Sequence, residues 1–164
     1  MLIIFGGLPG TGKSTLALRL ASQVGAVYLR IDTIERAIAS EEPLSVGEKG
    51  YRVAYAVAED NLRLGRTAIA DSVNPLQITR SAWRNVAERV GVEPVEVEVV
   101  CSDQAEHRHR VETRTVDIPV TWHEVATRHY EAWAGEHIRI DTAGQSIEQS
   151  FAALQQMLPT QLRP

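Results

Sequence analysis

The sequence places Gly7-Leu8-Pro9-Gly10-Thr11-Gly12-Lys13-Ser14 directly after the apolar run Leu2–Phe5. This octapeptide matches the pattern G-x-x-x-x-G-K-[ST] in full. Apolar residues then recur at helical spacing at Leu16, Leu20 and Val24, so the octapeptide lies where a predicted strand passes into a predicted helix. In that context the pattern is typical of a phosphate-binding loop, and a glycine-rich turn with an incidental Lys-Ser pair is the weaker interpretation.

The residue types of this loop suit a polyphosphate ligand. Glycines let the backbone amide groups turn inward around phosphate oxygens, and the following helix N-terminus adds partial positive charge. Lys13 can bridge the outer phosphates and the Ser14 hydroxyl can hold Mg²⁺, so we expect ATP and Mg²⁺ as ligands. The expected nucleotide-binding residues are Gly7, Leu8, Pro9, Gly10, Thr11, Gly12, Lys13, Ser14 and Thr15.

Four further strand-sized apolar runs alternate with helical patterns along the chain. The runs are Ala26–Leu29, Thr67–Ala70, Val95–Cys101 and His137–Ile140. The later helical patterns are Tyr51–Leu62, Ile78–Val90 and Ile147–Leu158. A helix-ending glycine stands before each of the four runs, namely Gly25, Gly65, Gly91 and Gly135. This order predicts an α/β fold of three layers, in which helices flank a five-stranded parallel sheet.

Finer features of this fold can also be predicted. Ser45-x-x-Glu48, Thr121-x-x-Glu124 and Ser146-x-x-Gln149 have the form of capping boxes, which satisfy free amide groups at helix N-termini. The strand Val95-Glu96-Val97-Glu98-Val99-Val100 alternates at its start, so we expect one of its faces to be partly solvated.

The second predicted strand ends in Arg30-Ile31-Asp32, with Arg36 one helical turn further on. We expect Asp32 at the carboxyl edge of the strand, where it could take a proton from an acceptor hydroxyl. Arg36 on the same face could orient the acceptor or a phosphate. The alternative is that Asp32 caps the helix and forms a surface ion pair.

The third predicted strand ends in Ala70-Asp71-Ser72-Val73-Asn74-Pro75, which places Asp71 beside the expected Mg²⁺. We expect Asp71 to help bind the metal, and a polar turn that closes the strand is the alternative for Asp71 and Asn74. No glutamate follows Asp71, and no Asn-Lys-x-Asp segment occurs in the chain. Both observations disfavour a motor ATPase or a GTPase.

Taken together, these segments resemble the small P-loop kinases that include gluconate kinases, adenylylsulfate kinases, chloramphenicol phosphotransferases and zeta toxins. The resemblance extends over most of the chain and rests mainly on Gly7–Ser14. It implies ATP-dependent phosphorylation of a hydroxyl on a small acceptor, with Asp32 as the base. The Asp-Gly-Asp signature of adenylylsulfate kinases is replaced here by Arg30-Ile31-Asp32, which argues against that particular substrate.

Residues 103–119, which contain His107-Arg108-His109-Arg110-Val111-Glu112-Thr113-Arg114, resemble the lid of this family. A short helix there would place Arg110 and Arg114 one turn apart. Lid arginines can neutralise charge on the transferring phosphoryl group and exclude water. The alternative is a solvated basic face that pairs with Glu106 and Glu112.

Other polar and aromatic residues point less clearly to function. No two of the five histidines have the i, i+4 spacing of a helical zinc site, so we expect no metal besides Mg²⁺. Trp122, Tyr130 and Trp133 have roughly helical spacing, and we expect them to belong to the core. Residues 141–144 follow the fifth strand, where the resemblance implies contacts to adenine and an ordinary turn is equally compatible.

Size and charge set the remaining expectations. At 164 residues, the chain predicts one domain over 1–164. A net charge of −4 disfavours general binding to nucleic acids or anionic membranes, and no apolar run is long enough to cross a bilayer. The single cysteine, Cys101, and the absence of a signal-peptide pattern favour the cytoplasm.

The sequence therefore predicts an ATP-dependent kinase that phosphorylates a hydroxyl of a small molecule. The expected catalytic residues are Lys13, Asp32, Arg36, Arg110 and Arg114, and the expected metal ligands are Ser14 and Asp71. Two alternatives remain open at this stage, a kinase that acts on nucleic-acid ends and a nucleotide-binding regulatory module without an acceptor. The identity of the acceptor and the oligomeric state do not follow from the sequence.

Overall fold

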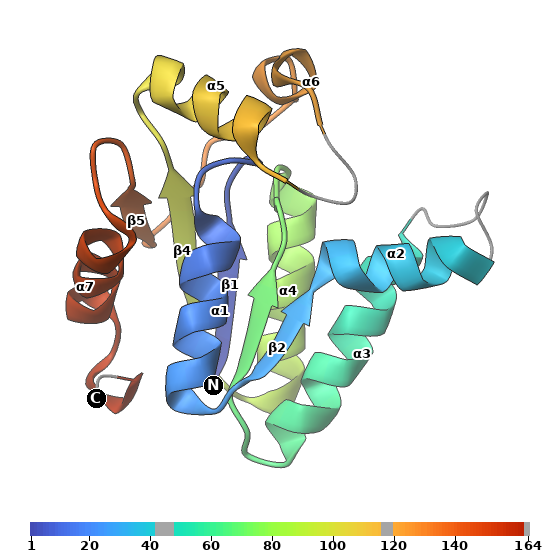
Figure 1. Ribbon diagram of the computed structural model, residues 1–164. Coiled ribbons are helices and arrows are strands. Elements are labelled where there is room, and N and C mark those ends of the chain that lie inside the picture. Colours follow the sequence, from blue (N-terminus) through green and yellow to red (C-terminus); the bar gives the residue numbers. More distant parts are fainter. Residues whose placement is uncertain (42–47, 116–119, 163–164) are drawn as a thin grey trace.

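Five parallel strands form the centre of the computed structural model, which describes residues 1–41, 48–115 and 120–162 (Figure 1). The strands are β1 (Leu2–Gly6), β2 (Val27–Arg30), β3 (Ala68–Asp71), β4 (Pro94–Val100) and β5 (Ile138–Asp141). They lie in the order β2-β3-β1-β4-β5. Strand β1, which is buried along its whole length, is central in this order. The strand runs predicted from the sequence are confirmed to within one or two residues.

Helices cover both faces of this sheet, as the sequence predicts. The helices are α1 (Lys13–Val24), α2 (Ile31–Glu41), α3 (Lys49–Arg63), α4 (Gln77–Val90), α5 (Gln104–Thr113), α6 (Trp122–Ala126) and α7 (Ile147–Met157), followed by the short 3₁₀ turn Thr160–Leu162. Helices α1 and α7 lie on one face, and α3 and α4 lie on the other (Figure 1). Three layers result, so the predicted fold class is confirmed.

The two faces of β1 anchor two separate apolar cores. Ile3 and Phe5 pack with Leu16 and Leu20 of α1 and with Phe151 and Leu154 of α7. Leu2 and Ile4 pack with Ala54, Ala58 and Trp83 of α3 and α4. Every residue of β1 is buried on both faces, which is why the strand reads as a continuous apolar run rather than an alternating one.

The predicted helix ends are largely confirmed. Glycines 25, 65 and 91 adopt positive φ angles directly after helices. Capping boxes are present at Thr121 and Ser146. The third predicted box begins at Ser45, which lies outside the described residues.

The expected helix before Gly135 ends early, because α6 stops at Ala126. Backbone groups of the following segment bond to α4 and its preceding loop instead. The Glu131 amide donates to Pro75, and the carbonyl groups of Glu131 and Ala132 accept from the Arg80 guanidinium. The Glu131 carboxylate also accepts from the Gln77 amide and thereby caps α4. Tertiary contacts therefore outweigh the helical spacing of this segment.

The face of β4 that carries glutamates is covered rather than partly solvated, so that prediction is wrong. Glu96 and Glu98 are 8% and 9% exposed. Arg84 of α4 forms two 2.8 Å hydrogen bonds to Glu96, and Arg139 and His137 lie 3.3 and 3.5 Å from Glu98. Long cationic side chains compensate these carboxylates, which makes their burial possible.

The carboxyl ends of all five strands meet at one edge of the sheet, because the strands are parallel. Helices α5 and α6 lie above this edge, and α2 projects from it at the end of β2 (Figure 1). Ligands of open parallel sheets bind outside this edge, at the point where the chain changes direction across the sheet. Within the described residues, no helix is long and apolar enough to span a membrane.

Candidate active site

The loop between β1 and α1 forms a tight turn that depends on glycine. Gly7 has a φ of 145°, and its amide donates to Val73 over 3.0 Å. A Cβ atom at Gly7 would lie 2.2 Å from the Val99 carbonyl oxygen, and one at Gly10 would lie 2.6 Å from the Val111 side chain. Neighbouring atoms therefore leave no room for side chains at these two positions, and the loop is held close to β3, β4 and α5.

Helix α5 packs directly on this loop. His107 lies 2.8 Å from the Pro9 carbonyl oxygen through its Nε2 atom, and both His107 and Val111 are buried against the loop. The sequence predicts a lid over 103–119, and the described part, 103–115, contains α5 with Asp103 as its N-cap. Residues 116–119 lie outside the described residues. The first half of the expected lid therefore contacts the nucleotide loop in this structure.

Lys13 of the loop forms a buried ion pair with Asp71 at the end of β3. The Lys13 ammonium lies 2.9 Å from Asp71 Oδ1, and the two residues are 8% and 1% exposed. The Tyr28 hydroxyl donates to Asp71 Oδ2 over 2.6 Å. Burial raises the pKa of Asp71, but the Lys13 charge and hydrogen bonds from Tyr28, Lys13 and Ser14 lower it further, so the net pKa lies below its usual value. Asp71 is therefore an ionised carboxylate beside the loop.

Ser14 and Asp71 together offer the ligands that Mg²⁺ prefers. The Ser14 hydroxyl accepts from the Lys13 ammonium over 3.3 Å, so its oxygen lies beside the Lys13–Asp71 pair. A hydroxyl and a carboxylate that supplement nucleotide phosphates are typical of Mg²⁺ sites, which seldom use a full protein cage. Among the described residues, no group of three or more His, Cys, Asp or Glu side chains could hold a metal.

A cavity of about 770 Å³ runs from the loop to the beginning of α2. Leu8, Pro9, Gly10, Gly12, Lys13, Ser14 and Thr15 line its nucleotide end. Arg30, Asp32, Glu35, Arg36, Ala39, Val73, Arg110, Arg114, Thr115, Val120 and Arg128 line the remainder. One cavity therefore brings together all the expected catalytic side chains with most of the expected nucleotide-binding loop.

The surroundings of Asp32 differ from the expectation. Asp32 lies in the first turn of α2, which begins at Ile31 with no intervening loop, and its side chain is 55% exposed. Its carboxylate pairs with Arg30 over 3.3 Å rather than with Arg36. Arg36 instead donates to the backbone oxygen of Asp32 and to Thr33. An arginine therefore does pair with the Asp32 carboxylate, but this arginine is Arg30 at the end of β2 and not Arg36.

The two lid arginines have different environments. Arg110 donates to the Thr142 hydroxyl and carbonyl oxygens over 2.8 and 2.9 Å and pairs with Glu106. Arg114 is the C-cap residue of α5 and lines the same cavity as Asp32 and Arg30. Burial lowers the pKa of Arg114, whereas Asp32 raises it and Arg30 lowers it. Arg108 pairs with Glu112 on the exposed face, as the alternative interpretation of this segment predicts.

Residues 141–144 form a well-bonded turn beside the loop. Asp141 accepts from the amides of Ser102 and Ala143, and the Gly144 amide donates to Glu106. The Thr142 hydroxyl lies 2.9 Å from the Thr11 carbonyl oxygen and 3.1 Å from that of Val100. The turn therefore connects β5 to the nucleotide loop, and a role in contacting adenine stays a prediction.

Several residues near the cavity were not singled out by the sequence. Tyr28 and Arg30 lie on β2, and Glu35 lies on α2. Burial and the nearby Asp32 raise the pKa of Glu35. Asn74 has a φ of 47° and donates from its amide to the Phe5 carbonyl oxygen, so it is a structural residue that joins β3 to β1. For these residues, the sequence offered one indication of a place near the cavity, namely that Arg30 directly precedes Ile31-Asp32.

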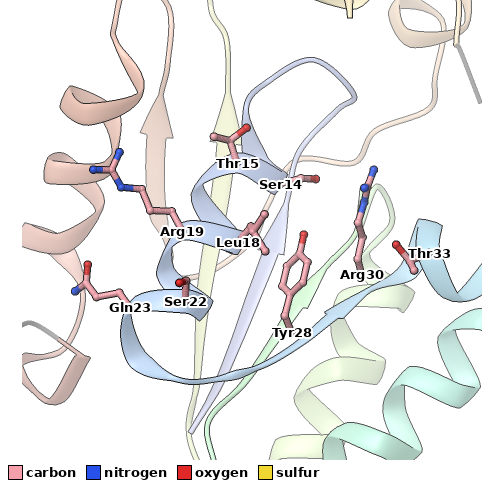
Figure 2. A pocket seen from close by; sticks show the side chains of 9 residues that line it. All are labelled: Ser14, Thr15, Leu18, Arg19, Ser22, Gln23, Tyr28, Arg30 and Thr33. Atoms are coloured by element: carbon pink, nitrogen blue, oxygen red, sulfur yellow. The ribbon is translucent and has the colours of Figure 1, made fainter. Parts of the chain in front are cut away.

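A second cavity, of about 720 Å³, lies beside the outer face of α1 (Figure 2). Its lining includes Leu18, Ser22, Tyr28 and Arg30. Figure 2 shows the Tyr28 and Arg30 side chains both rising from β2 toward the level of Ser14. Arg30 lines both cavities, so it marks the boundary between this groove and the cavity that contains Asp32.

A tight glycine-dependent turn, a buried Lys-Asp pair beside it and a parallel sheet with helices on both faces define a P-loop nucleotide-binding protein. The model of the AAA domain family AAA_33 matches residues 2–137. The chain belongs to this family. The resemblance to small P-loop kinases is confirmed at the level of family and fold.

Solved structures with the same fold include several kinases. A sugar kinase from Janibacter sp. is 15% identical, with coverage of 99% of this chain and 98% of that chain and a TM-score of 0.73. A gluconokinase from Sinorhizobium meliloti is 17% identical, with coverage of 94% and 91% and a TM-score of 0.65. Chaetomium thermophilum Kti12, solved with ADP-AlF3, is 20% identical, with coverage of 96% and 97% and a TM-score of 0.70. No curated protein matches the chain by sequence.

Proposed function

We propose that this protein is an ATP-dependent kinase that transfers the γ-phosphoryl group to a hydroxyl of a small molecule. The observation that carries the proposal is the single cavity that contains both the nucleotide loop and Asp32. In-line transfer requires donor and acceptor in one water-excluding space, with a carboxylate at the acceptor end. An isolated nucleotide-binding module has no need of the second half of this cavity.

Each residue receives a role within this proposal. Residues 7–15 hold the nucleotide phosphates, and Lys13 neutralises their charge. Ser14 and Asp71 hold Mg²⁺, which supplies charge neutralisation on the phosphoryl oxygens. Asp32 accepts the proton of the acceptor hydroxyl, and Arg36, which lines the same cavity, orients the acceptor or a phosphate. Arg110 and Arg114 act from α5, which already contacts the loop.

The proposal extends to the whole chain and to its setting. Residues 1–164 act as one domain, because α7 shares a core with α1 and β1 although it lies outside the matched family region. The lone, buried Cys101 is in keeping with a reducing cytoplasm.

ADP release from Mg²⁺-ATP, measured against pooled hydroxyl compounds, tests the proposal. The pools contain sugars, nucleosides, aminoglycoside-like and phenicol compounds, and oligonucleotides with a free 5′ hydroxyl. Wild type is compared with Asp32→Asn and with the control Asp60→Asn, which alters an exposed aspartate on α3.

We expect one small-molecule pool to stimulate ADP release in wild type and in Asp60→Asn but not in Asp32→Asn. Stimulation by oligonucleotides alone would favour a kinase of nucleic-acid ends. ATP binding without stimulation in any pool would favour a binding module. Stimulation of ADP release that persists in Asp32→Asn would show that Asp32 is not the base.

A further inference from the structure

Arg30 and Arg114 approach Asp32 from two different elements. Arg30 ends β2, and Arg114 follows the last residue of α5. Both line the cavity that contains Asp32. We propose that these two guanidinium groups bind an anionic group of the acceptor, a carboxylate or a phosphate, while its hydroxyl faces Asp32. This inference rests on the proposed kinase function and specifies the chemical class of the acceptor.

The first support is that both guanidinium groups have hydrogen-bonding capacity to spare. Arg30 Nε and Arg114 Nε are buried and have no hydrogen-bond partner within the described part of the chain. A buried donor without a partner is energetically costly, and more so when the group is charged. The Arg30–Asp32 contact spans 3.3 Å and leaves Arg30 Nε unused. Both arginines line the cavity and the Arg30 side chain is 34% exposed, so an oxyanion bound there would meet their guanidinium groups.

The second support is the charge of the cavity. Six cationic side chains line it, namely Lys13, Arg30, Arg36, Arg110, Arg114 and Arg128. Among the described residues, the lining carboxylates are Asp32 and Glu35. Lys13 and Arg110 have carboxylate partners outside this set, in Asp71 and Glu106. Among the described residues around Asp32, Arg30 and Arg114 bring more positive charge than the one carboxylate that Arg30 pairs with, which favours an anionic ligand over a neutral one.

The third support is position, which separates this pair from the nucleotide phosphates. Strand β2 is two strands away from β1 in the sheet. Neighbouring strands are about 4.8 Å apart, so the end of β2 lies about 10 Å from the end of β1, where the nucleotide loop begins. Figure 2 shows Arg30 standing on the end of β2 beside Thr33 of α2. Arg30 therefore belongs to the acceptor end of the cavity, and Arg114 lines the same cavity from the end of α5.

Titration with inorganic phosphate tests the anion site without any turnover. The protein is first saturated with Mg²⁺ and a non-hydrolysable ATP analogue, so that the nucleotide site is filled. Phosphate binding is then followed by calorimetry in wild type, Arg30→Gln and Arg114→Gln. Arg108→Gln is the matched control. Arg108 lies on α5, the helix that ends at Arg114, and it pairs with Glu112 on the exposed face.

We expect phosphate to bind wild type and Arg108→Gln equally, and each of the other two variants about tenfold more weakly, as the loss of a charge-assisted hydrogen bond implies. Arg30→Gln should keep its affinity for the ATP analogue. Absence of phosphate binding to the loaded wild type would overturn the inference. If Arg30→Gln lost as much affinity for the ATP analogue as for phosphate, the inference would also be overturned, because Arg30 would then hold the nucleotide.

Matched acceptors separate this inference from the proposed function. Neutral sugars and polyols are compared with the same compounds that carry a carboxylate or a phosphate, and ADP release is measured. We expect stimulation by the anionic members only, and an increased acceptor KM with little change in kcat in Arg30→Gln. Equal stimulation by neutral members would overturn the inference and leave the kinase intact. No stimulation by any compound would count against the kinase, and the phosphate titration would still decide the anion site.

Discussion

The two ends of the candidate active-site cavity differ in the sequence separation of their hydrogen-bonded charged residues. At the nucleotide end, Lys13 and Tyr28 bond Asp71 from 58 and 43 residues away, and the Lys13–Asp71 pair is buried. At the acceptor end, Arg30 and Arg36 bond Asp32 from two and four residues away, and these groups are partly exposed. The hydrogen bonds at Asp71 therefore join segments that are far apart in the chain, whereas the hydrogen bonds at Asp32 all come from one strand-to-helix junction.

This difference separates two kinds of function in one cavity. Buried groups that are joined across the sheet are held in place before a ligand arrives, which suits a constant ligand such as ATP. Exposed groups at one junction can reorient at small cost, and exposed ion pairs contribute little to stability. Changes at the acceptor end should therefore alter reactivity or specificity, whereas changes at the nucleotide end should also disturb the fold.

Lys13→Ala should break the nucleotide end and cause the largest effect. We expect kcat/KM for ATP to fall by about 10⁴-fold, because the phosphates lose their only lysine and the transition state loses that charge. Steady-state ADP release at varied ATP concentration measures kcat/KM. Lys49→Ala is the control, since it alters the chain's second lysine at the exposed start of α3. Near-wild-type activity in Lys13→Ala would show that the loop does not bind the reacting phosphates.

Asp32→Asn should break the acceptor end alone. We expect kcat to fall by about 10³-fold, within the range for loss of a general base, while the Kd of ATP stays the same. The unfolding free energy should change little, because the Asp32 side chain is 55% exposed and its ion pair is weak. Calorimetry with ATP and a urea titration complete the measurement. A parallel loss of ATP affinity would show that the two ends are not independent.

Tyr28→Phe should have a smaller effect, at the nucleotide end of the cavity. It removes the 2.6 Å hydrogen bond to Asp71 and leaves the ring in place. We expect a loss of about 1.5 kcal/mol in unfolding free energy, as for a hydrogen bond to a charged group, and a few-fold higher Mg²⁺ requirement. Tyr55→Phe, on α3, is the control. An unchanged Mg²⁺ requirement would confine Tyr28 to a structural role.

The smallest effect concerns alkaline pH and involves both ends. All four tyrosines have a raised pKa, chiefly because burial disfavours the phenolate, and the pKa of Tyr130 reaches about 12. Because the folded pKa values exceed the unfolded ones, their stabilising contribution is complete below pH 10 and is lost as the pH rises through the folded values.

Absorbance of tyrosinate near 295 nm follows this titration directly. The native protein should show little tyrosinate at pH 10, whereas the urea-unfolded chain should be about half ionised there. A fraction of the native amplitude that titrates near pH 10 would identify a tyrosine whose hydroxyl is solvated.

Local patterns predicted the fold and the nucleotide end well. The loop residues, the five strands and most helix ends follow from periodicity, glycines and caps that act within a few residues of one another. Asp71 could be placed near the loop, beside the expected Mg²⁺, because the carboxyl ends of parallel strands share one edge of the sheet, whereas its ion pair with Lys13 was not predicted.

Contacts between distant long side chains were the part that could not be predicted. The burial of Glu96 depends on Arg84, and the unwinding of residues after Ala126 depends on Arg80, which bonds their carbonyl groups. Neither arginine differs in sequence from a solvated helical residue. Likewise, the choice of Arg30 over Arg36 as the partner of Asp32 depends on where α2 begins, and sequence patterns locate helix starts only to within a few residues.

The packing of α5 on the nucleotide loop limits how this fold can be recombined. Gly10 has room for no side chain because Val111 and His107, about a hundred residues later, occupy that space. A helix transplanted from a relative to alter acceptor choice would have to reproduce both contacts or leave a void above the loop. The loop and α5 would thus have to be exchanged together, whereas the junction of β2 and α2 carries no such constraint at Gly10.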